Sequence, residues 1–268
     1  MLSIHIELGM VSKYNRVYDL SEGEIKLRIW LILAYLFFIG SCFGWILELF
    51  YRNISSRNKI WINPGFCTGP YLPIYGFGLC VLYLLASLEQ YAVIADPFWN
   101  KAALFASMAI GMTLIEYVAG VFCLKILKVR LWYYSEFPGN IQGIICPQFS
   151  AAWAVLGAIY YFLIHPHILE GLDWLSRNLA FSFFIGMFFG IFLIDVIHSS
   201  QLIVKLKRFA EENTVILAYE GIKDHIRDVQ EKAASKYHFF APFRSEHPLG
   251  EHLKEIAEHL HQQKKQRK

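Results

Sequence analysis

Three acidic side chains lie within long apolar stretches of the sequence: Glu48, Glu116 and Asp195. An acid at the centre of a bilayer costs about 2.5 to 3.5 kcal/mol, so such residues usually face a bundle interior or a wet cavity. A carboxylate there could bind a cation, a proton or a polar solute. The structural alternative is a buried acid that hydrogen-bonds to neighbouring helices, and Glu48, four residues before Arg52, could also reach the interface. The sequence leaves these interpretations open.

Each of these acids follows a glycine by four or five positions, and the glycines are Gly44, Gly111 and Gly190. The segments after the first two acids also share an order of residue types, with Trp61, Asn63, Gly65, Cys67 and Pro70 in one and Trp132, Asn140, Gly143, Cys146 and Pro147 in the other. This recurrence predicts a duplicated two-helix unit whose copies run parallel through the membrane. We expect the glycines to serve close helix packing rather than chemistry.

The stretches that carry these acids are long enough to cross a membrane, which takes about 20 mostly apolar residues. Five stretches qualify, at about residues 30–51, 71–88, 102–124, 149–169 and 179–203. Helices are expected because lipid offers no partner to an open backbone, and no stretch alternates as a barrel strand does. The predicted fold class is all-α, a polytopic membrane protein with five transmembrane helices and a helical C-terminal tail.

Charged residues are unevenly distributed along the chain of 268 residues. They make up 18% of it, and 23 of the 47 lie in residues 205–268. A soluble domain carries about 25% charge, so the composition excludes a single soluble globule and a nucleic-acid-binding domain. Five cysteines, an odd number, do not suit a secreted disulfide scaffold. We divide the chain into a polar N-terminal segment (1–28), a transmembrane domain (29–204) and a charged helical tail (205–268).

The segment of residues 63–78 contains four glycines, three prolines and no charged side chain. Prolines at this spacing exclude a simple helix, and a solvent-exposed loop would be more polar. The segment therefore predicts a loop packed into the protein or partly re-entrant, which makes it a second candidate site. The alternative is a rigid turn whose aromatic residues, Trp61, Tyr71 and Tyr75, lie in the membrane interface.

Five motifs together resemble a known family: GWILE at 44–48, PGFCTGPYLPIYGFG at 64–78, IEYVAG at 115–120, LWYYSEFPGNIQGIIC at 131–146 and FLID at 192–195. They are similar to the type IV ABC-transporter permeases, the CmpB-like family of bacterial membrane proteins, over about residues 30–200. The motif residues of the two loops are Asn63, Gly65, Phe66, Gly69, Pro70, Tyr71, Pro73, Tyr75, Gly76, Asn140 and Gly143. The resemblance implies Asp where this chain has Tyr133 and Arg where it has Ile144. The two would be able to form an ion pair, and their joint loss argues against a role of this loop that is shared with the family.

The resemblance implies a multi-pass permease subunit of the cell membrane, which moves a small polar or ionic solute with a separate ATP-hydrolysing subunit. The chain has no Gly-x-x-x-x-Gly-Lys-Ser/Thr loop of its own to bind nucleotide phosphates. We expect no cofactor and no catalytic residue in this chain. Two alternatives stay open: a membrane-embedded enzyme on a lipid-linked substrate with Glu116 or Asp195 as general base, and a structural or sensory component that acts through its tail.

Apolar residues of the tail recur at steps of three and four: Val215, Tyr219, Ile222, Ile226, Val229 and Ala233. This seam predicts an amphipathic helix that packs against the membrane domain or forms a short coiled coil between two copies of the chain. Farther on, Glu255 and His259 share a helical face, but the spacing fixes no third ligand, so we predict no metal site. The expected partners are the lipid bilayer, the separate ATPase and a second copy of the chain, without nucleic acid.

Basic residues near the ends of the five stretches predict the orientation of the chain. Nine Lys and Arg flank the side that carries the tail, against six on the other side. Because cytoplasmic loops are enriched in these residues, we expect a cytoplasmic C-terminus. A fluorescent protein fused after Lys268 should fold and fluoresce, and protease added to intact cells should leave it uncut. Cleavage of the tail from outside would contradict this orientation.

Overall fold

The computed structural model describes residues 22–55, 61–91, 94, 96–232, 238–245 and 247–266. Most of the predicted N-terminal segment therefore lies outside the described residues. The helices are α2 (Glu22–Ser55), α3 (Pro73–Ser87), α4 (Pro97–Val121), α5 (Pro147–Ile159), α6 (His165–Arg177), α7 (Ser182–Glu212), α8 (Tyr219–Lys232) and α9 (Leu249–Gln266). Two short strands, β1 (Val129–Arg130) and β2 (Leu217–Ala218), pair in parallel. The predicted all-α class is confirmed.

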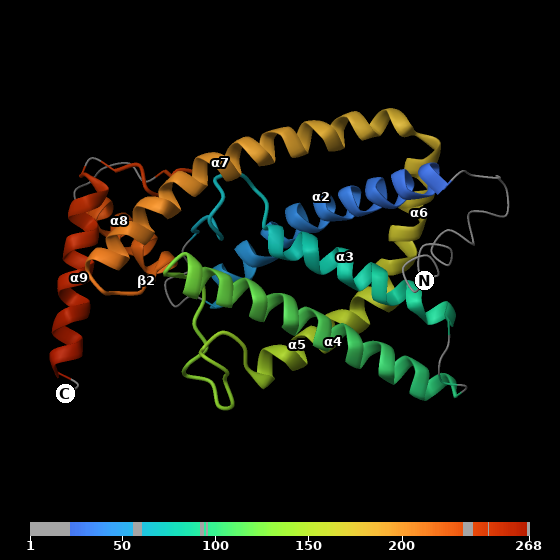
Figure 1. The fold of residues 1–268 in the computed structure, drawn as a ribbon, viewed down its shortest axis with the longest axis horizontal. Helices are drawn as coiled ribbons and strands as arrows, with labels where there is room; N and C mark the ends of the chain where they lie inside the picture. The colour runs from blue at the N-terminus through green and yellow to red at the C-terminus, as the bar shows by residue number, and fades with distance from the viewer. Residues whose placement is uncertain are drawn as a thin grey trace.

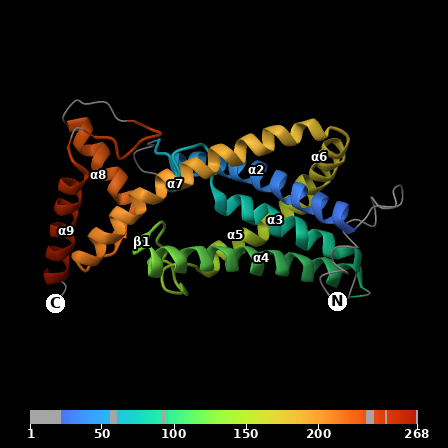
Figure 2. The same cartoon turned by 45° about the horizontal axis from the view of Figure 1, so that its top comes forward.

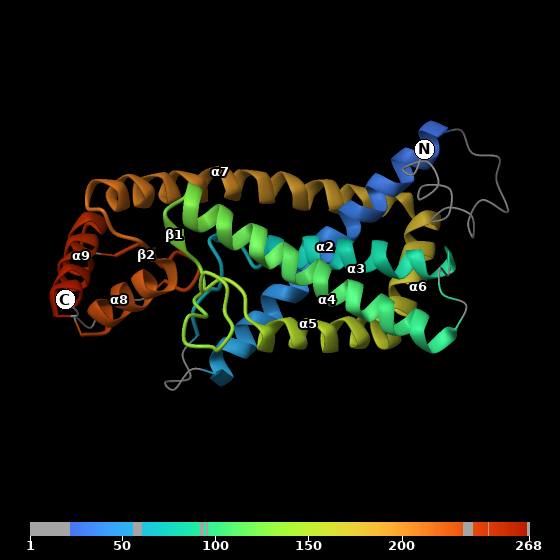
Figure 3. The ribbon, with the colours of Figure 1, turned by 60° about the horizontal axis from the view of Figure 1, so that its bottom comes forward.

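Short turns extend or join these helices. A π-helical turn, Phe122–Ile126, continues α4, and another, Tyr160–Ile164, joins α5 to α6. Two 3₁₀ turns, Leu88–Tyr91 and Leu179–Phe181, follow α3 and precede α7. The acid-bearing helices α2, α4 and α7 run in the same direction (Figures 1 and 3). Helix α3 and the α5–α6 segment, which connect them along the chain, run in the opposite direction (Figures 1 and 3).

Four helical segments of the described chain are long and apolar enough to cross a membrane: Lys26–Ile54, Pro97–Ile126, Pro147–Arg177 and Leu179–Glu212. The fifth predicted crossing corresponds to α3, which is apolar but has only 15 residues. At 1.5 Å per residue it is about 22 Å long, less than the roughly 30 Å of a hydrocarbon core. The polytopic membrane class holds, with four full-length helices and one shorter apolar helix.

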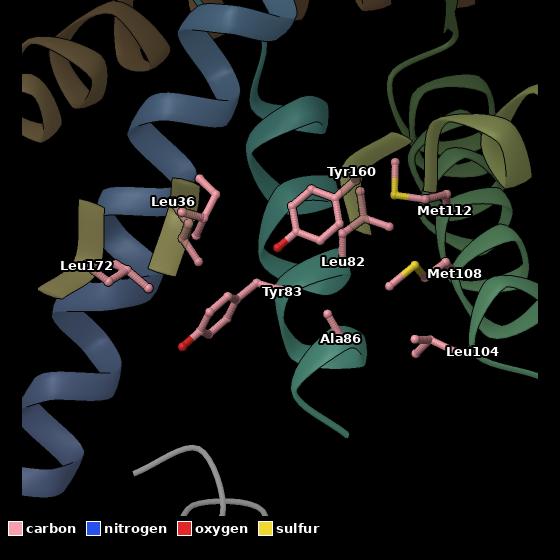
Figure 4. Packing of buried hydrophobic residues seen from close by; sticks show 10 residues of the cluster. Leu36, Leu82, Tyr83, Ala86, Leu104, Met108, Met112, Tyr160 and Leu172 are labelled. Carbon is pink, nitrogen blue, oxygen red and sulfur yellow. The ribbon is translucent and has the colours of Figure 1, made fainter. Parts of the chain in front are cut away.

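One apolar core surrounds α3 (Figure 4). On α3 itself, Leu82, Tyr83 and Ala86 are buried. Helix α2 contributes Leu36 to this core, and α4 contributes Leu104, Met108 and Met112. Tyr160 and Leu172, from the π-helical turn after α5 and from α6, complete the sticks labelled in the figure. The short helix is thus largely covered by protein, although Phe77 is exposed, whereas α7 lies at the side of the bundle (Figure 1).

Glycines allow α2 and α3 to approach closely. A Cβ atom on Gly44 would lie 2.2 Å from the Tyr75 side chain, and one on Gly76 would lie 2.3 Å from Ser41 Oγ. A Cβ on Gly111 would meet α3 side chains at 3.2 Å. The packing role predicted for Gly44 and Gly111 is confirmed. For Gly190 no such contact is made within the described chain, since its Cβ would have no described atom within 4 Å.

The charged tail packs against the end of the bundle where α7 and the loop after α4 meet (Figure 2). Tyr219, Ile222 and Ile226 of the predicted seam are buried in an apolar cluster with residues of α7 and α9. The seam therefore packs within its own chain, as the first of the two interpretations predicted, and these three side chains are not available to a coiled coil. Ala233 lies outside the described residues.

The contact of α2 with α3 gives a direct stability prediction. Gly76→Ala should lower the free energy of unfolding by about 1–3 kcal/mol, because the new methyl group would overlap Ser41 Oγ and, at 2.7 Å, the Phe37 carbonyl oxygen. Gly190→Ala is the matched control and should leave stability equal or slightly higher, since it adds helix propensity in open space. Thermal unfolding of both variants in one detergent would measure the difference, and equal stability would contradict the packing argument.

Candidate functional site

Asp195 of α7 holds the motif loop, which we define as residues 61–72. Its Oδ1 accepts hydrogen bonds from Thr68 N at 3.1 Å and Ser199 Oγ at 3.0 Å. Its Oδ2 accepts from Gly69 N at 2.8 Å and from the Tyr71 hydroxyl. A carboxylate has about four lone-pair sites, so these four donors leave none for a solute. The geometry favours the structural interpretation of this acid.

The motif loop is folded by its own residues as well. Asn63 is 1% exposed, accepts a hydrogen bond from Trp45 Nε1 at 2.7 Å and donates to the carbonyls of Cys67 and Thr68 at 3.2 and 3.0 Å. Gly65 has a φ of +75°, which suits a residue without Cβ. After Pro70, Pro73 occupies the first turn of α3, where its missing N–H costs little. The loop is packed into the protein, as one of the two interpretations predicted.

The tail contacts the same loop through Lys223 of α8. Its ammonium group donates to the carbonyl oxygens of Asn63 at 2.7 Å and Gly65 at 2.6 Å, and it pairs with Glu220 at 3.4 Å. Lys223 is 1% exposed, and this burial lowers the pKa of its ammonium group. Tyr219 adds a bond to the carbonyl oxygen of Phe66 at 3.4 Å. No sequence signal singled out Lys223, because it lies next to the seam among ordinary tail charges.

Glu48 connects α2 to both α3 and the tail. It accepts hydrogen bonds from the Tyr75 hydroxyl at 2.8 Å and from Arg52 Nε at 2.7 Å. Arg52 also pairs with Glu220 of α8 at 2.9 Å. Glu48 thus takes part in a continuous set of contacts from α3 to the tail, and its side chain keeps 20% of its exposure.

Glu116 of α4 is more deeply buried, with 5% exposure. Its two carboxylate oxygens accept hydrogen bonds from Tyr134 Oη and Trp153 Nε1, each at 3.0 Å. Tyr134 lies outside the membrane-spanning segments, and its pKa is raised by burial and then by the charges of Glu116 and Glu48. The hydroxyl therefore remains a donor at neutral pH.

Glu48 and Glu116 belong to one site, and Asp195 to another. The rings of Tyr75 and Trp153 lie edge to face with centroids 6.2 Å apart, and each ring donates to one of the two carboxylates. The structure thus brings two of the three predicted acids to the same aromatic pair. Sequence reasoning missed Trp153 and Tyr134, because nothing in the spacing indicates which distant donors reach an acid. Arg52 lies four residues after Glu48, the spacing of an ion pair on a helix, but the sequence analysis used it only to place Glu48 near the interface.

The second loop, residues 127–146, is ordered by Asn140, whose Oδ1 accepts from Gly143 N at 3.1 Å. Tyr133 and Ile144, in the same loop, make different contacts. The Arg130 guanidinium lies 4.6 Å from the centre of the Tyr133 ring, a cation–π contact. Ile144 is 5% exposed and packs closely on Gly120, because a Cβ atom on Gly120 would lie 2.2 Å from Ile144 Cγ2. Ile144 therefore packs in the interior, whereas Tyr133 is 54% exposed.

A cavity of about 590 Å³ lies between the motif loop, α7, α8 and the segment before α9. Its lining includes the basic side chains of His198, Lys205, Lys223 and Arg244, and no acidic residue. Cys67 also lines it, and burial raises the pKa of this thiol to about 12, with Asp195 contributing. The thiol is therefore neutral and a poor nucleophile at physiological pH.

One group of side chains in the described chain has the composition of a metal site. His225 of α8 and His252 and Glu255 of α9 offer ligand atoms that all lie within 4.8 Å of one another. From spacing alone, Glu255 shares a helical face with His259, and no metal site is predicted. The spacing could not reveal His225, because the pairing of α8 with α9 brings it to the site.

These features define a polytopic α-helical membrane protein whose charged tail contacts the motif loop through Lys223 and Tyr219. A family described as "Putative ABC-transporter type IV" matches residues 35–200, and the chain belongs to this family. The match confirms the family suggested by the motifs and covers both loops and all three acids. No match to a curated protein or to a solved structure reaches significance.

The hydrogen bonds from Thr68 and Gly69 to Asp195 predict that a mutation of this acid loosens the motif loop. Asp195→Asn should destabilise the protein by about 1–3 kcal/mol, because the amide nitrogen cannot accept from the backbone of Thr68 or Gly69. Maleimide labelling of Cys67, which is 3% exposed, should accelerate about tenfold as the loop opens. Mass spectrometry of labelled peptides would measure the rate.

Asp173→Asn on α6 is the matched control, since Asp173 pairs only with Arg177 on an exposed surface among the described residues. It should leave the labelling rate unchanged. Equal labelling of Cys67 in wild type and Asp195→Asn would show that the carboxylate does not hold the loop.

Proposed function

We propose that the chain is the membrane-embedded permease subunit of an ABC-type transporter, with Glu48 and Glu116 as its polar solute site. The observation that carries this proposal is the meeting of the two carboxylates, from parallel helices, at the Tyr75–Trp153 pair. Membership of the family supports the transporter class. The geometry supports the choice of these two acids over Asp195, whose acceptor sites are all engaged.

Arg52 pairs with Glu48, whereas the carboxylate of Glu116 is bound by the neutral donors Tyr134 and Trp153, so a negative potential remains at Glu116 inside the apolar bundle. Such a region favours a proton, a metal cation or the cationic part of a small solute. A solute could take the place of the hydrogen bonds that Tyr75 and Trp153 now donate to the two acids, and these side chains could rotate away without unfolding any helix. The transported species is therefore expected to be small and positively charged.

The link from Glu48 through Arg52 to Glu220 gives the site a connection to the tail. Both loops and the tail lie at the same end of the bundle (Figure 1). We expect the separate ATPase to bind at this end, because a displacement of α8 there would act on Arg52 directly and on the motif loop through Lys223.

The enzyme alternative has less support. Asp195 has no free acceptor site for a general base, and the neighbouring Cys67 is a neutral thiol. A sensory role of the tail is compatible with the permease proposal, since its contacts would then transmit a signal to the same site.

The test begins with purification of the full chain in mild detergent and identification of the proteins that remain bound. An ATP-hydrolysing partner with a phosphate-binding loop supports the transporter class, and its absence from the eluate would contradict it. The complex is then placed in vesicles that contain fluorescent reporters for H⁺, Na⁺ and K⁺, and ATP is supplied outside.

We expect ATP-dependent flux of one of these cations, and Glu116→Gln should abolish it by removing the charge while nearly keeping the side-chain shape. Glu136→Gln, an exposed acid of the second loop, is the control and should keep full flux. Size-exclusion profiles would verify that both variants fold and keep their partner. Full cation flux in a folded Glu116→Gln variant would show that Glu116 is not part of the solute site.

A further inference from the structure

His225, His252 and Glu255 form a compact donor set between the two tail helices. His225 Nε2 lies 3.1 Å from Glu255 Oε2, and the two imidazole rings have centroids 5.4 Å apart at 81°. In a tetrahedral zinc site with bonds of about 2.0–2.2 Å, ligand atoms are about 3.3–3.6 Å apart. Ligand atoms that already lie within 4.8 Å can reach this geometry by small side-chain rotations.

The hydrogen bonds of Ser245 determine which nitrogen of His252 carries a lone pair. The single hydroxyl hydrogen of Ser245 is donated to the carbonyl oxygen of His247 at 2.6 Å. Ser245 Oγ must therefore accept from His252 Nε2, which lies 3.0 Å away. This leaves His252 Nδ1 unprotonated and oriented by a partner on its other nitrogen, the arrangement typical of a histidine that ligates a metal.

The nitrogen of His225 that faces this set is also available. His225 Nε2 is buried and makes no hydrogen bond of acceptable geometry within the described chain, despite its short distance to Glu255. An imidazole nitrogen that carries neither a proton nor a hydrogen bond is free to ligate a metal ion.

We propose that His225, His252 and Glu255 bind a Zn²⁺ ion that crosslinks α8 to α9. Two imidazoles and one carboxylate are a known zinc donor set, with a water molecule in the fourth position. Ca²⁺ and Mg²⁺ prefer oxygen ligands and do not suit it. Because α8 also holds the motif loop through Lys223, the ion would brace the tail against the membrane domain. The site does not depend on the transport proposal.

The test uses the full chain, purified without a polyhistidine tag, and titrates it with ZnCl₂ by calorimetry after treatment with a chelator. We expect one Zn²⁺ per chain, a higher melting temperature that chelator reverses, and no such effect of MgCl₂. Co²⁺ should give the visible absorption of a tetrahedral complex, which an incidental surface ion would not give.

Glu255→Gln and His225→Gln should each weaken Zn²⁺ binding at least tenfold. Glu255 is largely exposed, so its substitution should not affect folding. The controls are Glu258→Gln and His259→Ala, which remove the same chemical groups from exposed positions of α9 and should leave binding unchanged. Unchanged binding in both ligand variants, or equal weakening in the controls, would overturn the site.

Discussion

The structure depends on the pairing of backbone polar groups in the motif loop. This loop brings amides and carbonyls to the end of an apolar bundle, where each group left without a partner would cost about 1–3 kcal/mol. Asp195 pairs the amides of Thr68 and Gly69, and Lys223 pairs the carbonyls of Asn63 and Gly65. One anion and one cation, from two consecutive helices that lie far from the loop in the sequence, thus satisfy the two kinds of backbone group.

This pairing also explains how α7 and the tail stay attached. Only 6% of the most apolar window of α7 is buried, so packing alone holds this helix weakly to the bundle. Asp195 and the cluster of Phe37, Tyr71 and Phe188 join it to the motif loop and to α2. The tail continues from α7 and returns to the loop through Lys223. Loop, α7 and tail therefore form one connected unit, next to the site of Glu48 and Glu116.

Several features of the site could be read from residue types. The cost of an acid in lipid singled out Glu48, Glu116 and Asp195, and the prolines of the motif loop excluded a helix there. The roles of the acids could not be separated in this way, because an acid bound by four protein donors and an acid beside a second carboxylate have the same local sequence signal. Trp153 and Lys223 were missed for the same reason, since each acts on a residue more than 30 positions away.

The sequence by itself determined the all-α membrane class, the acid-bearing helices and the family, because apolar length and motif residues are local properties. Only the tertiary structure decided that α3 is too short to span a full bilayer core yet lies at the centre of the bundle, and that the tail seam packs within its own chain. It also decided that Asp195 is a clamp, that Glu48 and Glu116 share an aromatic pair and that His225 meets Glu255. The physical reason is that hydrogen-bond partners and donor sets are fixed by which helices touch, and helix contacts depend on the whole chain.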